Sequence, residues 1–251
     1  MTPLFATRSR RRPRAPQLDG RYWSEALHIT RSNRDGRTQA ADRFSDDPVR
    51  GTRAARDAWR AGVTHATVQY SAGLDIDDIA DTVIVAGVHF VDWTARATHL
   101  QGAHPRLDDG IDYSFDVLRL VALAVGCGVG DATDRILGAV VVQGADGVFS
   151  RLGASQLRGG TVATTPRPAR ELLSSLDPAD DPIAHLQTHL DEWPIRLKAM
   201  PWMGALERSQ PGDVDFIGYW AFEIVGVARA RGVHVPDLRG DVVPVDILSS
   251  E

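Results

Sequence analysis

Three aspartates near the start of one helical segment have a spacing that suits divalent cations. Asp77, Asp78 and Asp81 form the pattern DDxxD, which places carboxylates at positions i, i+1 and i+4. Carboxylate oxygens are ligands that Mg²⁺ prefers, and bound Mg²⁺ can in turn hold a diphosphate. Negative charge in the first turn of a helix is also favoured by the helix dipole without any ligand. The sequence shows no second acidic motif of this kind and no cluster of Lys or Arg beside the first, which favours the structural interpretation.

Two other patterns have the spacing of ligand sites. His185 and His189 stand four residues apart with Glu192 one turn further, so three metal ligands could share one helix face. An apolar stripe runs beside them, as in an ordinary amphipathic helix. Gly126–Gly130 imitates a phosphate-binding glycine loop, but no strand precedes it. We predict no metal or cofactor at either pattern, and we expect the lone cysteine of that loop, Cys127, to be a buried and unreactive thiol.

A carboxylate also stands inside the most apolar segment of the C-terminal third. Glu223 lies between aromatic and aliphatic neighbours in the run 217–225. A buried carboxylate must find hydrogen-bond partners or take up a proton. We expect a nearby Tyr, Arg or backbone group to bind Glu223, and we expect its role to be structural.

The charge of the chain is unevenly distributed. The 251 residues carry a net charge of −5, yet residues 75–116 contain nine aspartates against two arginines. An acidic body argues against nucleic acid as the direct ligand, since such binding relies on Lys and Arg that neutralise phosphates. It favours a basic protein partner. One segment is basic, and we expect its arginines to be solvated or paired with nearby aspartates: Arg50, Arg53, Arg56 and Arg60, with Asp46, Asp47 and Asp57.

Residues 1–18 are rich in arginine and proline and lack the apolar run of a signal peptide. We predict that they form a disordered, solvated tail. The longest apolar stretch, Val121–Val129, is too short to cross a membrane. A single cysteine excludes an intrachain disulfide, so we expect a reducing, cytoplasmic location.

The remainder of the chain follows helical periodicity without a convincing series of strands. We predict long helices over 19–44, 48–71, 75–97, 111–126 and 131–143. In the third of these we expect one apolar stripe to face the core, formed by Ile76, Ile79, Val83, Ala86, Val88 and Val91.

The C-terminal part is predicted to be helical as well. We expect short pieces over 147–157 and 168–175, a helix over 183–197 that Pro194 must kink or restart, and a last buried helix over 217–231. The predicted fold is therefore an all-α multi-helix bundle, with about nine helices in two packed halves.

Several segments within these helices have the order and spacing of one protein family. They are Tyr22-Trp23, Gln69-Tyr-Ser-Ala-Gly73, Asp112-Tyr-Ser-Phe-Asp-Val-Leu118, Leu190-Asp-Glu-Trp193, Gly218-Tyr-Trp-Ala-Phe-Glu223, Gly232-Val-His-Val-Pro-Asp-Leu238 and Val243-Pro-Val-Asp-Ile-Leu248. Over roughly residues 20–248 the sequence resembles the PoNi (polymorphic nuclease immunity) proteins. The resemblance implies an N-terminal helical domain over 19–145 and a C-terminal one over 146–248. It implies a structural signature at Gly218, Tyr219, Trp220, Phe222 and Glu223.

The resemblance also implies a function. Members of this family are immunity proteins that bind and neutralise a cognate DNase toxin of a polymorphic toxin system used in bacterial competition. The expectation is then a cytoplasmic, non-enzymatic protein without cofactor, whose partner is a nuclease toxin and which contacts neither nucleic acid nor membrane; a homodimer stays open. We place the toxin-binding surface on exposed aspartates: Asp75, Asp77, Asp78, Asp108, Asp109, Asp112 and Asp116. The alternative is an all-α, Mg²⁺-dependent isoprenoid-type enzyme that uses Asp77, Asp78 and Asp81.

Overall fold

The structure is a computed structural model of the chain, and it describes residues 14–15, 18–102, 105, 111–142, 170–177, 179–198, 203–208, 216–233 and 237–249. All regular secondary structure within these ranges is helical. The helices are α1 (Gly20–Arg43), α2 (Pro48–Ser71), α3 (Ile76–Gln101), α4 (Ile111–Gly126), α5 (Gly130–Val142), α7 (Arg170–Ser175), α8 (Pro182–Arg196), α9 (Ala205–Arg208), α10 (Glu223–Arg231) and α11 (Val245–Ser249). The predicted all-α bundle is confirmed. The helical piece predicted over 147–157 lies outside the described residues.

Local signals explain why the first helices begin and end where they do. Asp19 caps α1 by accepting hydrogen bonds from the backbone N–H groups of Arg21 and Tyr22. Asp47 does the same for α2, whose first residue is a proline that needs no amide partner. The chain leaves α2 through Gly73, which has a φ of 83° as expected of a left-handed residue beyond a helix end.

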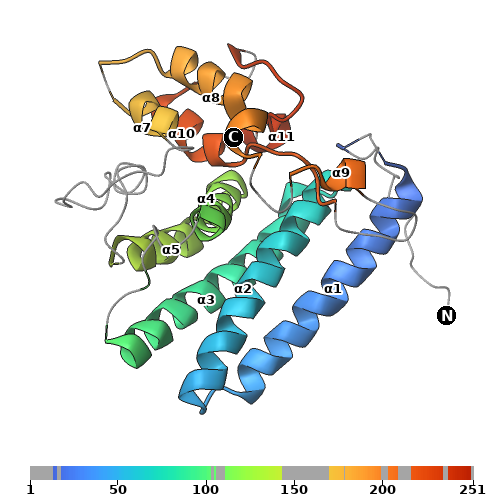
Figure 1. Cartoon of the computed structure of the whole chain (residues 1–251), viewed down its shortest axis with the longest axis vertical. Coiled ribbons are helices and arrows are strands. Elements are labelled where there is room, and N and C mark those ends of the chain that lie inside the picture. The colour runs from blue at the N-terminus through green and yellow to red at the C-terminus, as the bar shows by residue number, and fades with distance from the viewer. Residues whose placement is uncertain are drawn as a thin grey trace.

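Three long helices form one half of the molecule. In Figure 1 α1, α2 and α3 run side by side, and α2 packs against both of the others. Because of this central position, buried residues occur around nearly the whole circumference of α2. Gly62 of α2 allows close packing, since a Cβ atom on it would lie 2.7 Å from that of Ala86 in α3. The first two helices, α1 and α2, pack together as a hairpin.

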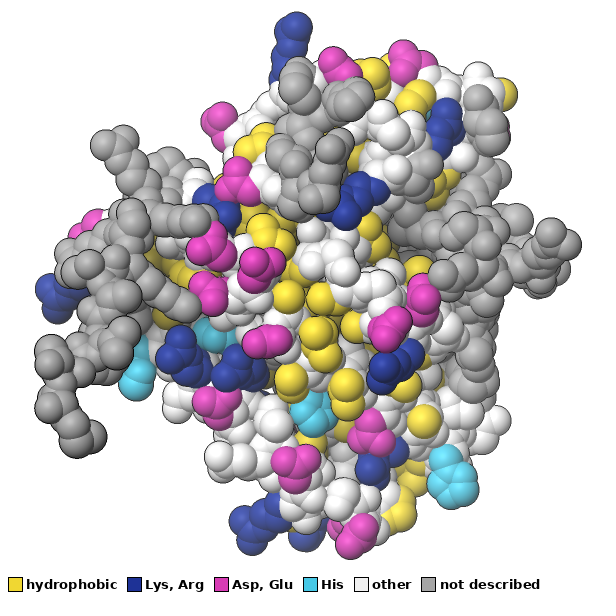
Figure 2. Space-filling view, turned by 180° about the vertical axis from the view of Figure 1, so that it is seen from behind, with side chains coloured by type: hydrophobic (Ala, Val, Ile, Leu, Met, Phe, Trp, Pro, Cys, Tyr) yellow, Lys and Arg dark blue, Asp and Glu magenta, His cyan; other side chains and the backbone are white. Residues whose placement is uncertain are grey.

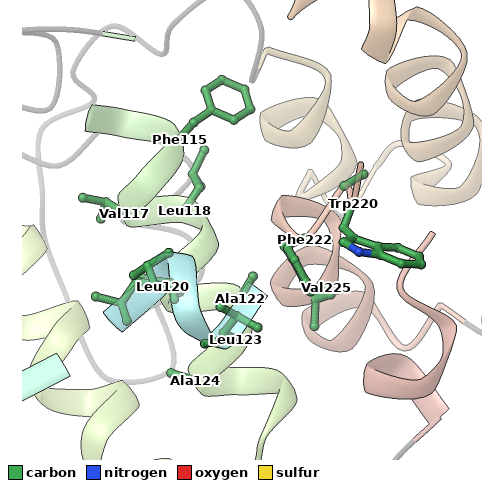
Figure 3. Close-up of a cluster of buried hydrophobic side chains, with 14 of the residues drawn as sticks. Phe115, Val117, Leu118, Leu120, Ala122, Leu123, Ala124, Trp220, Phe222 and Val225 are labelled. Carbon is green, nitrogen blue, oxygen red and sulfur yellow. The ribbon is translucent and has the colours of Figure 1, made fainter. Parts of the chain in front are cut away.

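The second half gathers around α10. Helices α7, α8, α10 and α11 lie together at the top of Figure 1, and α4 connects them to the long helices. Figure 3 shows side chains of α4, including Leu118 and Leu123, facing Phe222 and Val225 of the C-terminal half. These residues belong to one continuous hydrophobic core that includes both halves. The boundary predicted near residue 145 therefore does not separate two independent cores.

The helix predicted over 217–231 corresponds to α10 and begins later than predicted. Residues 217–221 are not helical, and α10 starts only at Glu223. Gly218 explains the break, because its φ of 101° is a conformation that L-amino acids rarely adopt. A Cβ atom there would also lie 2.3 Å from the Oγ of Ser71. Hydrophobic spacing alone could not reveal this backbone requirement.

Two further boundaries differ from the predictions. Helix α8 continues through Pro194 and ends at Arg196, so the proline stands in the last turn and does not restart the helix.

Arg14 and Ala15 are not part of a solvated tail. The Nη1 of Arg14 donates to the carbonyl oxygens of Tyr70 and Leu74 at 2.9 and 2.8 Å, and Ala15 is buried under Trp23, whose indole donates to its carbonyl. The predicted tail therefore ends before Arg14.

Candidate functional site

The acidic residues proposed as an interface do not all have the same surroundings. Asp75 precedes α3, and Asp77 and Asp78 lie in its first turn, with Asp77 exposed. Asp112 is half-buried in the first turn of α4. Asp108 and Asp109 lie outside the described residues. Among the candidates, the carboxylates at the start of α3 are thus the ones that the structure places together.

Asp116 is not a free surface carboxylate. Its Oδ2 lies 2.6 Å from Nη2 of Arg60, and its Oδ1 lies 3.8 Å from Nη1 of the buried Arg119. Burial raises the pKa of Asp116, while Arg119 and Arg60 oppose that rise. Burial likewise lowers the pKa of the Arg119 guanidinium, against the attraction of Asp116 and Glu223. Asp116 is therefore a half-buried, paired carboxylate and not one of the exposed aspartates that were expected there.

The exposed face of α3 leads into an apolar groove. Asp77, Asp81, Ile84 and Val88 follow one another at helical spacing and are all exposed. A cavity of about 550 Å³ lies beside this face, between α3 and the start of α5. We call it the α3–α5 groove, and it is lined by Ile84, Gly87, Val88, Val91, Val129, Gly130, Asp131, Ala132 and Arg135.

This groove was not predicted from the sequence. Val88 was expected to face the core, yet 52% of its surface is exposed, and that of Ile84 is 39% exposed. The space-filling view in Figure 2 shows hydrophobic side chains exposed on the face turned away from the viewer in Figure 1, with acidic and basic side chains on either side. Apolar residues at the surface of one groove mark a place where another chain can bind.

Exposed carboxylates lie on both helices that border the groove. Asp77 and Asp81 precede Ile84 on α3, and Asp131 and Asp134 occupy the first two turns of α5. All four residues are exposed. Arg135 is the one cation that lines the groove among the described residues. A partner with apolar side chains next to positive charge would be complementary to this surface.

A second cluster of titratable groups lies deep between α8 and α10. Glu223, whose surface is 5% exposed, accepts hydrogen bonds from Nε2 of His189 at 2.9 Å and from Nε1 of Trp193 at 2.6 Å. The prediction that Glu223 is buried is confirmed, but its partners are a histidine and a tryptophan. Their side chains come from α8, 30 and 34 residues away in the chain, so spacing could not identify them.

The motifs that carry the PoNi resemblance meet in this interior. Tyr70 contacts both Trp220 and Phe222 edge to face, with ring centroids 5.0 and 5.2 Å apart. Ser71 accepts a hydrogen bond from Nε1 of Trp220 at 2.8 Å. Tyr22 donates to the carbonyl oxygen of Phe216 at 2.7 Å. These side chains therefore join α1 and α2 to the C-terminal segment.

The suggested metal ligands are separated from one another. His189 is buried against Glu223, whereas Nε2 of His185 lies 3.6 Å from Asp180. Glu192 pairs with Arg196 in the same helix. Within the described ranges no group of three or more His, Cys, Asp or Glu side chains is arranged to hold a metal ion. Cys127 is half-buried and not fully buried as predicted, and burial raises the pKa of its thiol to about 12, which disfavours the reactive thiolate.

One buried histidine was missed by the sequence analysis. Nδ1 of His65 lies 2.8 Å from Oγ1 of Thr30, which itself donates to the carbonyl oxygen of Ala26. The hydroxyl hydrogen is thus in use, so Nδ1 of His65 carries the proton in this bond. Burial, together with the nearby Arg34 and Arg31, lowers the pKa of His65 to about 4. The imidazole is neutral and has a structural role.

The arginines of α2 are largely paired. Arg50 lies near Asp47 and Arg56 near Asp57, as predicted. Arg60 pairs with Asp116 of α4, which the sequence could not show. None of the helices in the described part of the chain is long and apolar enough to cross a membrane.

Comparisons with known proteins support the fold and no more than the fold. Protein PA2201 from Pseudomonas aeruginosa has a similar crystal structure, with a TM-score of 0.61 and 19% sequence identity. The similarity covers 96% of this chain and 92% of that one. No family model matches the sequence, and no curated protein matches it.

Proposed function

We propose that this protein is an immunity protein that binds and neutralises a cognate nuclease toxin in the cytoplasm of the cell that makes both. The observation that carries the proposal is the exposed face of α3, where Asp77 and Asp81 lead directly into the α3–α5 groove. The resemblance to PoNi proteins supports the same function. The residues behind that resemblance hold the interior together, and they are distinct from the acidic and apolar surface of α3.

The two parts of this surface have different physical roles. Nuclease domains are commonly basic where they hold DNA, so exposed carboxylates accelerate their association and make the rate depend on salt. Apolar side chains such as Ile84 and Val88 add affinity when a partner removes them from water. A protein with this surface needs no catalytic group or cofactor to act as an inhibitor.

The proposal requires a nuclease toxin encoded beside the gene for this protein, and the test uses the nuclease domain of that toxin. We expect the two proteins to co-purify and the association rate to fall with rising salt. Changing Asp75, Asp77 and Asp78 together to Asn should lower both the rate and its salt dependence. Asp108, Asp109 and Asp112 form a second set for the same measurement. The matched control changes three exposed aspartates elsewhere, Asp42, Asp46 and Asp241, to Asn. Equal rates for all variants would place the interface elsewhere, with the arginines of α2 next to be tested.

One observation favours the second candidate, an isoprenoid-type enzyme. Asp77 and Asp81 share a helix face with the apolar groove, so a diphosphate held at these carboxylates would have an apolar space beside it. The discriminating measurement is Mg²⁺-dependent release of diphosphate from an allylic diphosphate. Activity that disappears in Asp77→Ala and in Asp81→Ala would establish the enzyme, and a lack of release at high protein concentration would exclude it.

A further inference from the structure

We propose that the α3–α5 groove is a binding site for residues 1–13 of the same chain. This segment contains Leu4 and Phe5 followed by Arg8, Arg10, Arg11 and Arg12, and it lies outside the described residues. The inference goes beyond the proposed function, because it concerns the free protein and requires no toxin.

The first argument is the point at which the described chain starts. Arg14 is fixed beside the beginning of α3, where its guanidinium donates to the carbonyl oxygen of Leu74 at 2.8 Å and stacks on the ring of Tyr70 at 4.5 Å. It also pairs with Asp246. Residues 1–13 are therefore attached to the rest of the protein at a point close to the N-terminal end of α3.

The second argument is the order of charge and hydrophobicity on both sides. Moving away from Leu74 along α3, the exposed face presents first Asp77 and Asp81, then Ile84 and Val88. Moving away from Arg14 toward the N-terminus, the sequence presents first a set of basic residues and then a set of apolar ones, namely Arg12, Arg11, Arg10 and Arg8, followed by Phe5 and Leu4. Basic residues thus match carboxylates, and apolar residues match the groove, in one antiparallel register.

The third argument is reach. Ile84 lies ten residues beyond Leu74, which is about 15 Å along an α-helix. Phe5 stands nine residues before Arg14, and an extended chain of that length spans about 30 Å. The segment can therefore bring Phe5 to Ile84 or Val88 with slack to spare. Two apolar side chains fit within the roughly 550 Å³ of the groove.

The groove also contains a group that opposes this docking. Arg135 repels the arginines of the segment, but Asp131 lies one turn before it on α5 and Asp134 is its neighbour. The exposed carboxylates of the two helices, Asp77, Asp81, Asp131 and Asp134, outnumber this one lining cation. Attraction between exposed charges weakens with salt, so docking should be strongest at low ionic strength.

Trypsin provides the test on the full chain, because it cleaves after Arg8, Arg10 and Arg11, whereas the bond after Arg12 precedes a proline and is resistant. The rate of release of N-terminal fragments is followed by mass spectrometry at low salt. We expect the double variant Ile84→Asp, Val88→Asp to be cleaved about ten times faster than the wild-type protein. This factor follows if the segment is undocked in roughly 10% of wild-type molecules and in nearly all molecules of the variant. Leu4→Ser with Phe5→Ser should have the same effect without touching the folded body. Val49→Asp is the control, since Val49 is also an exposed apolar residue, at 60%, but lies on α2.

Each outcome decides the inference. Equal cleavage rates in the wild-type protein and in both double variants would overturn it. Protection that is lost on dilution would show that the segment binds the groove of a second copy, which would also overturn docking within one chain. The expected result is that the segment is protected from trypsin at every protein concentration. This protection should weaken in 0.3 M salt, where the screening length is on the order of 5–6 Å. Since toxin is absent from the assay, failure here leaves the proposed function standing.

Discussion

The indole N–H of Trp220 donates to the hydroxyl oxygen of Ser71, 149 residues earlier in the chain, at 2.8 Å. Ser71 is the last residue of α2, and Trp220 stands in the non-helical segment before α10. Ser71 also donates to the carbonyl oxygen of Ile217 at 2.6 Å. One serine thus joins the long helices to the C-terminal segment.

Removing this hydroxyl should destabilise the protein. Ser71→Ala leaves the buried indole N–H without its acceptor, and such a loss costs about 1–3 kcal/mol. Trp220→Ala should cost about 3–5 kcal/mol, because it also leaves a cavity. Urea denaturation followed by circular dichroism measures both. Ser24→Ala is the control, since that serine is exposed and bonds only within α1. A stable Trp220→Ala protein that loses only toxin binding would show that Trp220 faces the partner.

Glu223 should be sensitive to the shape of its replacement. Glu223→Ala leaves the donors of His189 and Trp193 without an acceptor, at about 1–3 kcal/mol for each. Glu223→Gln retains an acceptor oxygen and should cost less in urea denaturation. Glu192→Ala provides the comparison, because Glu192 forms an exposed pair within α8 that contributes about 1 kcal/mol or less. Equal stability of the Ala and Gln variants at position 223 would argue against these hydrogen bonds.

His65 should make the protein less stable in mild acid. Its pKa is about 4 in the folded protein and 6.5 in the unfolded chain, so below pH 6.5 the unfolded state binds more protons. The contribution of the neutral His65 to the free energy of unfolding is complete above pH 6.5. It is lost as the pH falls to about 4, and the loss is on the order of 3 kcal/mol. The free energy of unfolding of His65→Gln should change less between these pH values. Burial also lowers the pKa of His89, which remains in both proteins and cancels in the comparison.

Replacing Asp116 should destabilise the protein, whereas replacing Asp77 should leave its stability almost unchanged. Asp116→Asn removes the carboxylate that pairs with the buried Arg119, and breaking a buried pair costs as much as about 3–5 kcal/mol. Asp77→Asn changes an exposed side chain and should leave the melting temperature within about a degree, since such surface changes amount to less than about 0.5 kcal/mol. Thermal denaturation separates the two. A large loss of stability in Asp77→Asn would show that its role is in folding.

Close contact between α2 and α3 predicts a contrast between two glycines. Gly62→Ala would place its Cβ 2.7 Å from that of Ala86, so the helices must separate at a cost of about 1–3 kcal/mol. Gly138 in α5 has no such neighbour within 4 Å, and Gly138→Ala should gain about 0.5–1 kcal/mol from helix propensity. Urea denaturation of both variants checks the sign of each effect.

The sequence predicted best what depends on neighbours in the chain. Asp47 with Pro48 and Gly73 define the ends of α2 through capping and backbone conformation, which are local properties. The spacing of apolar residues then predicted the all-α fold. It misplaced Val88, because periodicity identifies an apolar face but not whether another helix covers it.

The candidate site depended on contacts that no spacing contains. Asp116 and Arg60 are 56 residues apart, and only the packing of α4 on α2 brings them to 2.6 Å. Asp77 and Asp81 were identified from sequence, but the groove beside them is formed by α5 from another part of the chain. Charge patterns thus indicated one half of the surface, and tertiary structure supplied the other.

The pairing of Glu223 with His189 and Trp193 has an evolutionary consequence. An apolar residue cannot replace Glu223 alone without leaving the buried donors of His189 and Trp193 unpaired. In diverging lineages the substitutions at these positions should therefore arrive together, with an apolar residue at 223 accompanied by loss of the imidazole at 189. Exposed positions outside the α3–α5 groove, such as Val49, carry no such mutual constraint, so the outer surface can diversify while the interior stays fixed.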